Sequence, residues 1–188
     1  MRTLPLLSLM SLAMLAACHA KPSIDAKNAS AADVAKQISA NGDMKPHPGH
    51  WDTVITFEKM DMPGMNDQMR AIMQKGMGAE RHHASCLTPE EAAKPRGAYF
   101  NQAESGCSYE HFTMGGGRLD EKMKCDRGPG KATVTMTGTY GPDTYSVHTT
   151  SEASMGEGHT ISTAMTMTAH RTGACDGTEP GHIAPHAP

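Results

Sequence analysis

Strict alternation of apolar and polar side chains over residues 131–140 is the feature that most restricts the fold. Even-numbered residues in Lys-Ala-Thr-Val-Thr-Met-Thr-Gly-Thr-Tyr are apolar or glycine, and odd-numbered ones are lysine or threonine. A period of two sets these groups on opposite faces of a β-strand, one toward a core and one toward water. The turn Gly-Pro-Asp-Thr at 141–144 predicts a hairpin. Its expected cross-strand pairs are Tyr140 with Tyr145 and Gly138 with Val147.

The same alternation recurs along the chain. Residues 107–114 and 118–125 fold into a hairpin about three glycines, and residues 161–169 form a last strand. An earlier strand over 51–58 places one apolar set on a single face: Trp51, Thr53, Ile55 and Phe57. With a short strand at 81–87, we predict a mainly β protein of about seven strands. The expected architecture is a curved antiparallel meander, a half-barrel or small barrel, with one or two short helices.

Helix-capping residues mark three short helices. Ser30 precedes a helix over 31–40 and Asn66 precedes one over 67–75. Thr88 begins a single turn that carries two acids. The second helix has methionines at helical spacing, and we expect the Met/Val/Tyr/Trp face of the sheet to pack on it.

Composition limits the core and the possible partners. The 188 residues include one Trp, three Phe and four Tyr but 16 Met, so the core is thin and needs covalent support. The charges nearly balance, with 17 basic and 20 acidic residues, which gives no electrostatic basis for binding nucleic acid.

The N-terminal segment predicts export and a lipid anchor. Arg2 precedes an apolar run that is too short to span a membrane, and the run ends Leu-Ala-Ala-Cys18. This ending resembles the lipobox of bacterial lipoproteins, in which the cysteine thiol carries diacylglycerol. We therefore expect a signal peptide over 1–17, lipidation of Cys18, and membrane attachment through that anchor. His19 stands where an Asp would favour the inner membrane, which indicates the outer membrane, facing the periplasm.

Four further cysteines predict two disulfides in an exported domain. Three connectivities are possible. The hairpin about Gly116 puts Cys107 opposite Cys125, together with Tyr109 opposite Met123 and Thr113 opposite Leu119. This register favours a Cys107–Cys125 bridge, and elimination then leaves Cys86–Cys175.

Several motifs resemble one family of small exported proteobacterial proteins, DUF3617. They occur in order as Pro48-Gly49-x-Trp51, Met-Pro-Gly-Met, Cys86-Leu-Thr-Pro-Glu90, Cys107, Met-Lys-Cys125, Met-Thr-Gly, Thr-Met-Thr-Met and Arg171-x-Gly-x-Cys175. The resemblance covers about residues 46–176. It implies no activity, ligand or functional residue. We accordingly expect residues 18–45 to be a lipidated tether with a short helix, 46–176 the β-domain, and 177–188 a disordered Pro/His tail.

Methionine and histidine are the only candidate metal ligands. The series Met60, Met62, Met65, Met69 and Met73, continued at Met77, offers soft thioethers suited to Cu(I), although methionine at this spacing is more typical of core packing. Adjacent His82 and His83 point to opposite faces of a strand. The remaining candidates are a possible local pair, His47 and His50, and two tail residues, His182 and His186.

No enzymatic signature appears in the sequence. It contains no Gly-x-Ser-x-Gly, no His-Glu-x-x-His and no P-loop. We predict a protein that is not an enzyme and needs no cofactor: a cell-envelope lipoprotein, either a binding or an envelope-maintenance module. The expected partner is a hydrophobic ligand or an envelope protein, and the alternative is periplasmic copper binding through Met and His.

Overall fold

The computed structural model describes residues 23–41, 45–77, 79–93, 106–127, 130–154, 160–177 and 179. Three helices and eight strands form its elements. In chain order they are β1 (Ser23–Ser30), α1 (Ala31–Asn41), β2 (Gly49–Asp61), α2 (Asp67–Gly76), β3 (Glu80–Leu87), α3 (Pro89–Ala93), β4 (Cys107–Gly115), β5 (Arg118–Arg127), β6 (Gly130–Tyr140), β7 (Thr144–Ser154) and β8 (Thr160–Gly173).

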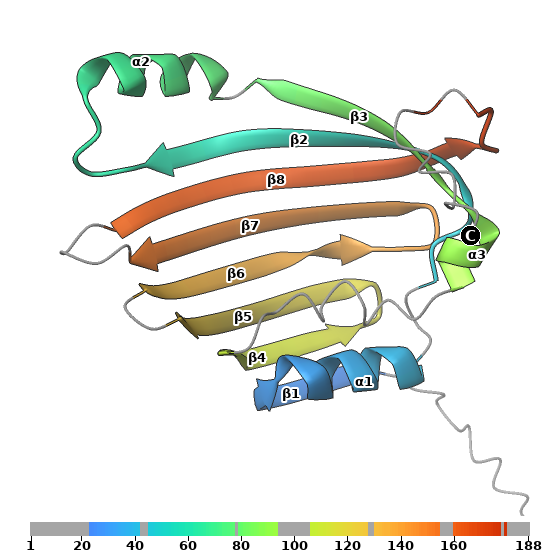
Figure 1. Cartoon of the computed structure of the whole chain (residues 1–188). Helices are drawn as coiled ribbons and strands as arrows, with labels where there is room; N and C mark the ends of the chain where they lie inside the picture. The colour runs from blue at the N-terminus through green and yellow to red at the C-terminus, as the bar shows by residue number, and fades with distance from the viewer. Residues whose placement is uncertain are drawn as a thin grey trace, which may run out of the picture.

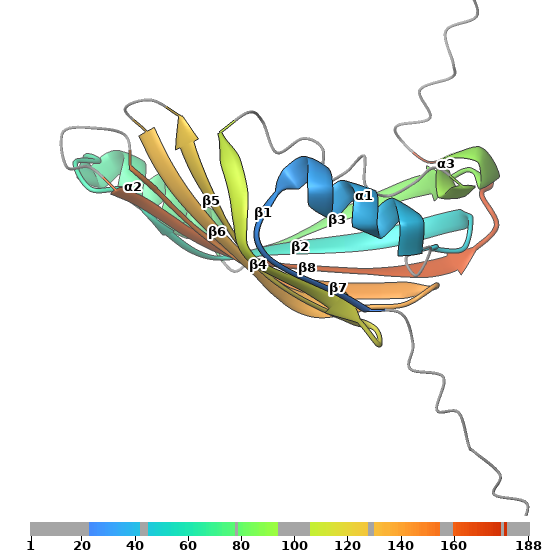
Figure 2. The same cartoon turned by 90° about the horizontal axis from the view of Figure 1, so that it is seen from below.

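All eight strands belong to one antiparallel sheet, in the order β1-β4-β5-β6-β7-β8-β2-β3 (Figure 1). The sheet is not closed, since β1 and β3 are its two edges. It bends toward the face that carries α1, which Figure 2 shows lying within the curve. The predicted curved meander is confirmed as an open sheet with one strand more than expected.

The additional strand is β1, so the predicted tether is wrong over residues 23–29. This segment pairs along β4, from Ser23 opposite Gly115 to Ala29 opposite Tyr109. Ile24 and Ala26 are buried, but the alternation is short and charged residues interrupt it. Residues 18–22 lie outside the described residues. At the other end of the chain, Gly177 and a buried Glu179 are described within the predicted tail, and 178 and 180–188 are not.

Most of the predicted strand registers are confirmed. Tyr140 pairs with Tyr145 and Gly138 with Val147. Cys107 lies opposite Cys125, and Tyr109 lies opposite Met123. The predicted pairing of Thr113 with Leu119 is wrong, because a β-bulge at Glu110 shifts the register by one and brings Met114 opposite Leu119. Because the bulge reverses the faces of the residues after it, Phe112 and Met114 join Tyr109 in the core.

The buried core lies at the β1 edge of the sheet, under α1. Its members are Ile24, Ala26, Ala31, Val34, Ile38, Tyr109, Phe112, Met114 and Leu119. The prediction that the Met-rich helix covers the sheet is wrong, since no described side chain of α2 is buried. Met69 and Ile72 are 49% and 59% exposed. Helix α1 has small and branched apolar residues on one side and packs closely, whereas α2 extends beyond the end of β2 (Figure 1).

The three predicted helix starts are confirmed by their hydrogen bonds. The Asp33 amide donates to the Ser30 hydroxyl (3.1 Å), and the Met69 amide donates to the Asn66 side chain (2.8 Å). Thr88 and Glu91 form a reciprocal capping box at α3, with bonds of 3.0 and 3.2 Å. Local sequence therefore determines where each helix begins, independently of what the helix packs against.

Candidate functional site

The concave face of the sheet divides into a covered half and an open half. Over β1 and β4 its side chains are covered by α1, Leu119 of β5 joins the same core, and Phe112 is fully buried. Over β6, β7, β8 and β2 the same face continues with half-buried side chains that are mostly apolar, with Thr149, Ser151 and Thr163 among them. Its one charged residue in the described ranges, Arg171, lies at the Trp51 end and donates to the Pro48 carbonyl. These half-buried residues include Ile55, Phe57, Val134, Met136, Tyr145, Val147, Ile161, Met165 and Met167. We call this surface the open face.

Two aromatic residues close one end of the open face. Trp51 is 5% exposed, stacks on Tyr145 with 6.2 Å between ring centroids, and donates its indole N–H to the carbonyl of His47 (3.1 Å). The expected role of Trp51 as a core residue is confirmed. Ile55 and Phe57 are only half-buried, so Trp51 is the only one of these three apolar side chains of β2 that belongs to the buried core.

A buried carboxyl group lies at the inner limit of the open face. Glu121 is 3% exposed and pairs across the sheet with Phe112 on one side and Met136 on the other. Its Oε2 atom has no hydrogen-bond partner. Burial raises the pKa of Glu121 to about 7, against a smaller opposing effect of His111. The same desolvation, together with the nearby Glu121, raises the pKa of Tyr109. Glu121 was not predicted as a site residue, although strict alternation between Leu119 and Met123 places it inward.

Methionines gather at the opposite end of the molecule, beside α2. One cavity of about 270 Å³ is lined by Met60, Met62, Met65, Met73 and Met77, with Lys59, Asp61 and Arg70. A neighbouring cavity of about 260 Å³ shares three of these methionines and adds Phe57, Ile72, Gly76 and Arg81. Four of the five predicted thioether ligands therefore lie together. Met69 does not line either cavity, because the helix turns it outward to solvent.

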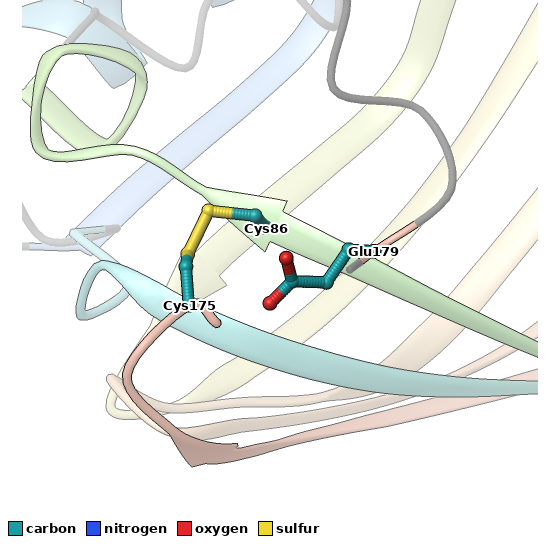
Figure 3. A group of neighbouring side chains, drawn as sticks. All are labelled: Cys86, Cys175 and Glu179. Atoms are coloured by element: carbon teal, nitrogen blue, oxygen red, sulfur yellow. A yellow bond between two sulfur atoms is a disulfide. The ribbon is translucent and has the colours of Figure 1, made fainter. Parts of the chain in front are cut away.

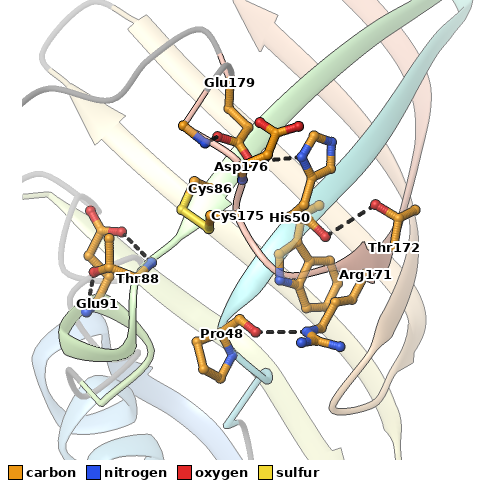
Figure 4. Close-up of a disulfide and its surroundings, with 12 residues drawn as sticks. Pro48, His50, Cys86, Thr88, Glu91, Arg171, Thr172, Cys175, Asp176 and Glu179 are labelled. Carbon is orange, nitrogen blue, oxygen red and sulfur yellow. Dashed lines mark hydrogen bonds and ion pairs between the residues drawn. A yellow bond between two sulfur atoms is a disulfide. The ribbon is translucent and has the colours of Figure 1, made fainter.

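A cluster of polar side chains lies beside the Cys86–Cys175 disulfide (Figures 3 and 4). His50 Nδ1 lies 2.8 Å from Glu179 Oε1, and its Nε2 lies 3.3 Å from Asp52 Oδ1. The Glu179 side chain is 1% exposed and accepts hydrogen bonds from the amides of Asp176 (3.1 Å) and Gly177 (3.0 Å). His50, Asp176 and Glu179 could together offer three ligand atoms within 4.8 Å of one another.

Both ends of this ion pair have shifted pKa values. The hydrogen bond with Glu179 raises the pKa of His50, although burial opposes it. Backbone hydrogen bonds, first that of its own amide and then that from Asp176, lower the pKa of Glu179. A charged His50 and a charged Glu179 therefore form an ion pair, which holds Glu179 beside the disulfide.

Contacts around Gly49 explain why two of the motifs occur together. Gly49 has φ = 145°, and a Cβ atom there would lie 2.1 Å from the carbonyl oxygen of Gly173. Arg171 Nε donates to the carbonyl of Pro48 at 2.7 Å (Figure 4). The Pro-Gly-x-Trp and Arg-x-Gly-x-Cys motifs thus form one clamp between β2 and β8, with structural rather than chemical purpose.

Both predicted disulfides are present, Cys86–Cys175 and Cys107–Cys125. The histidines are distributed and mostly paired with carboxylates. His47 lies 2.9 Å from Asp143 rather than beside His50. His82 contacts Glu80 at 3.4 Å, and its neighbour His83 pairs with Thr53 across the sheet. Cys18, His182 and His186 lie outside the described residues. No helix within the described ranges has the length and hydropathy needed to cross a membrane.

Comparison with known proteins places these features in a family context. No curated protein and no solved structure matches the chain. A family model described as a protein of unknown function, DUF3617, matches residues 46–175. The matched region runs from just before the Pro48–Arg171 clamp to the second cysteine of the Cys86–Cys175 disulfide, and leaves β1 and α1 outside. Because this match covers most of the sequence, the chain belongs to the DUF3617 family.

Proposed function

We propose that the protein is a non-enzymatic lipoprotein of the cell envelope that holds an acyl chain on its open face. The observation that carries this proposal is the unequal covering of one continuous apolar surface. Helix α1 covers the part of that surface over β1 and β4, with Leu119 of β5, while the part over β6, β7, β8 and β2 keeps half-buried apolar side chains. Exposed apolar area of this kind is a favourable binding surface, since about 25 cal/mol is gained per Å² removed from water.

The chemistry of the open face favours a linear, uncharged ligand. Its centre is built from Met136, Met165 and Met167, whose unbranched thioethers adapt to an irregular apolar partner. Apart from Arg171 at its Trp51 end, the face has no charged side chain among the described residues of four adjacent strands, a width of roughly 14 Å at about 4.8 Å per strand. Away from Arg171 a charged ligand would find no opposite charge on this face, whereas an acyl chain loses no hydrogen bonds on entering.

The anchor supplies the location. Cys18 precedes the first described residue, Ser23, by five positions, a reach of at most about 17 Å. Lipidation at Cys18 therefore holds the β1 edge close to the membrane and leaves α2, near the opposite edge, toward the periplasm. Substituting Cys18→Ser should abolish labelling by a palmitate analogue and release the protein from membranes. Continued membrane retention of an unlabelled protein would contradict the anchor.

Native mass spectrometry of the purified protein, combined with titration of a fluorescent palmitate analogue, tests the ligand. We expect a co-purified acyl-bearing molecule, or saturable binding of the analogue. Met165→Glu, which puts a charge in the centre of the open face, should abolish that binding. Thr168→Glu is the matched control, because Thr168 is exposed on the opposite face of the same strand. Absence of any binding, equal loss in both variants, or a protein partner cross-linked at Met165 would each overturn the proposal.

A further inference from the structure

The cavity lined by Met60, Met62, Met65, Met73 and Met77, which we call the thioether cavity, has a composition that apolar packing does not require. Five of its eight lining residues are methionine, and neither leucine nor valine contributes to it. Met60 is 36% exposed, and the other four are half-buried. These methionine side chains therefore line a cavity that is reached from solvent, unlike the buried core under α1.

Two local structures bring these methionines together. The turn Met62-Pro63-Gly64-Met65 closes with a hydrogen bond from the Met65 amide to the Met62 carbonyl (3.3 Å), and Gly64 adopts φ = 87°. Met62 and Met65 therefore stand at the two ends of one turn. Met73 lies in the last turns of α2 and Met77 directly follows the helix, and both line the cavity. Met60 enters from the end of β2.

Each charged residue of the cavity either has a partner in the protein or is offset by a nearby opposite charge. Arg70 donates to the carbonyl of Met65 (3.3 Å) and lies 4.0 Å from Asp67, so its guanidinium is held by the helix start. Lys59 and Asp61, two residues apart, contribute opposite charges. The neutral thioethers therefore dominate the chemistry that a small ligand would meet in the cavity.

Thioether sulfur is a soft, uncharged donor and selects soft cations over Zn²⁺, Ca²⁺ or Mg²⁺. Competing soft ligands are absent nearby, because all four cysteines in the described part of the chain are disulfide-bonded. We propose that the thioether cavity binds one monovalent soft cation, Cu(I), through three or more of these five methionines. The site is separate from the open face, and the binding step involves no oxidation or reduction.

The test is a titration of the purified protein with Cu(I) under anaerobic conditions, with ascorbate as reductant and bicinchoninate as competing chelator. Ag(I), which needs no reductant, serves as a second probe. We expect one Cu(I) per chain and X-ray absorption that shows sulfur coordination. The variant Met62→Leu/Met65→Leu/Met73→Leu/Met77→Leu keeps the apolar volume but removes the ligands. Because loss of an outer-sphere partner alone costs about 10- to 100-fold in affinity, this variant should bind at least about 100-fold more weakly.

The matched control is Met136→Leu/Met165→Leu/Met167→Leu, which removes three thioethers from the open face and should leave Cu(I) affinity unchanged. If the fourfold variant does not fold, the Met62/Met65 and Met73/Met77 double variants answer the same question separately. Wild-type protein that fails to compete with bicinchoninate would overturn the proposal, as would full binding in every cavity variant. Acyl binding should survive the cavity substitutions, so failure of the copper site and failure of the proposed function are distinguishable.

Discussion

The α1 end and the α2 end of the molecule use helices of similar length in opposite ways. α1 has 11 residues and places Val34 and Ile38 in a sealed core, at 0% and 4% exposure. α2 has 10 residues and a stronger separation of apolar and polar sides, yet it leaves Met69 and Ile72 half exposed. Amphipathic pattern alone therefore does not show whether a helix stabilises a fold. The α1 end supplies stability, and the α2 end supplies accessible surface.

Truncating one phenylalanine at each end gives the largest expected contrast. Phe112→Ala removes a fully buried ring that contacts Tyr109 edge-on at 5.3 Å, and should lower the free energy of unfolding by about 3–5 kcal/mol. Phe57→Ala removes a half-buried ring near α2 and should cost less than half as much. Urea denaturation of both variants measures the difference. Equal losses would show that the two ends are comparably packed.

The pH dependence of stability should depend on Glu121. Its pKa rises from 4.5 in the unfolded chain to about 7 in the fold, so the folded state holds a proton that the unfolded state releases. Stability is then greatest below about pH 4.5 for this group and falls as the pH rises to 7, by at most about 3 kcal/mol. Glu121→Gln should remove this decline. Urea midpoints at pH 5 and 8 check it, and an unchanged pH slope in the variant would contradict the assignment.

Removing the N-cap residue of each helix tests whether α1 and α2 contribute differently to global stability. The expected loss at α1 is about 1 kcal/mol. Ser30→Ala deletes the acceptor of the Asp33 amide and should lower global stability by about that amount, because α1 belongs to the core. Asn66→Ala deletes the acceptor of the Met69 amide and should speed hydrogen exchange in α2 without moving the global transition. A shift of the urea midpoint by Asn66→Ala would mean that α2 unfolds with the sheet.

The smallest effect is expected at Ile72. Its side chain is 59% exposed, so Ile72→Ala should change the free energy of unfolding by no more than about 0.5 kcal/mol. Ile38→Ala in α1, a residue that is 4% exposed, is the control and should cost about 2–5 kcal/mol. Thermal unfolding followed by circular dichroism measures both. A destabilised Ile72→Ala protein would place α2 within the core.

The sequence predicted nearly every local feature of the sheet, and it missed features that depend on distant contacts. Alternation located the strands, and the Pro-Asp turn set the register of Tyr140 with Tyr145. The hairpin about Gly116 predicted the Cys107–Cys125 pair correctly. The bulge at Glu110 was not predictable, because a single unpaired residue leaves the alternating pattern readable on either side.

The candidate sites likewise combine features that the sequence predicted with features that only the folded structure revealed. The methionine series was visible in the sequence, but only the folded turn and helix show that Met69 turns outward while Met62, Met65, Met73 and Met77 share a cavity. The ion pair of His50 with Glu179 joins residues 129 positions apart, and no local pattern connects them. The buried carboxyl of Glu121 needed both the alternation of β5 and its burial in the folded structure to be recognised.

The amino-acid sequence by itself determined every strand except β1, the helix starts, the disulfide pairs and the family. The strands, the helix starts and the Cys107–Cys125 pair depend on spacing within a few residues or on the parity of strand positions, which the chain carries locally. The Cys86–Cys175 pair then followed by elimination, and the family from the order of the motifs. Only the tertiary structure decided which helix covers the sheet and which part of the apolar face stays open. That choice depends on β1, whose weak pattern gains a place in the sheet only by pairing with β4 and packing under α1. Burial is a property of the assembled fold, so no stretch of sequence could specify it alone.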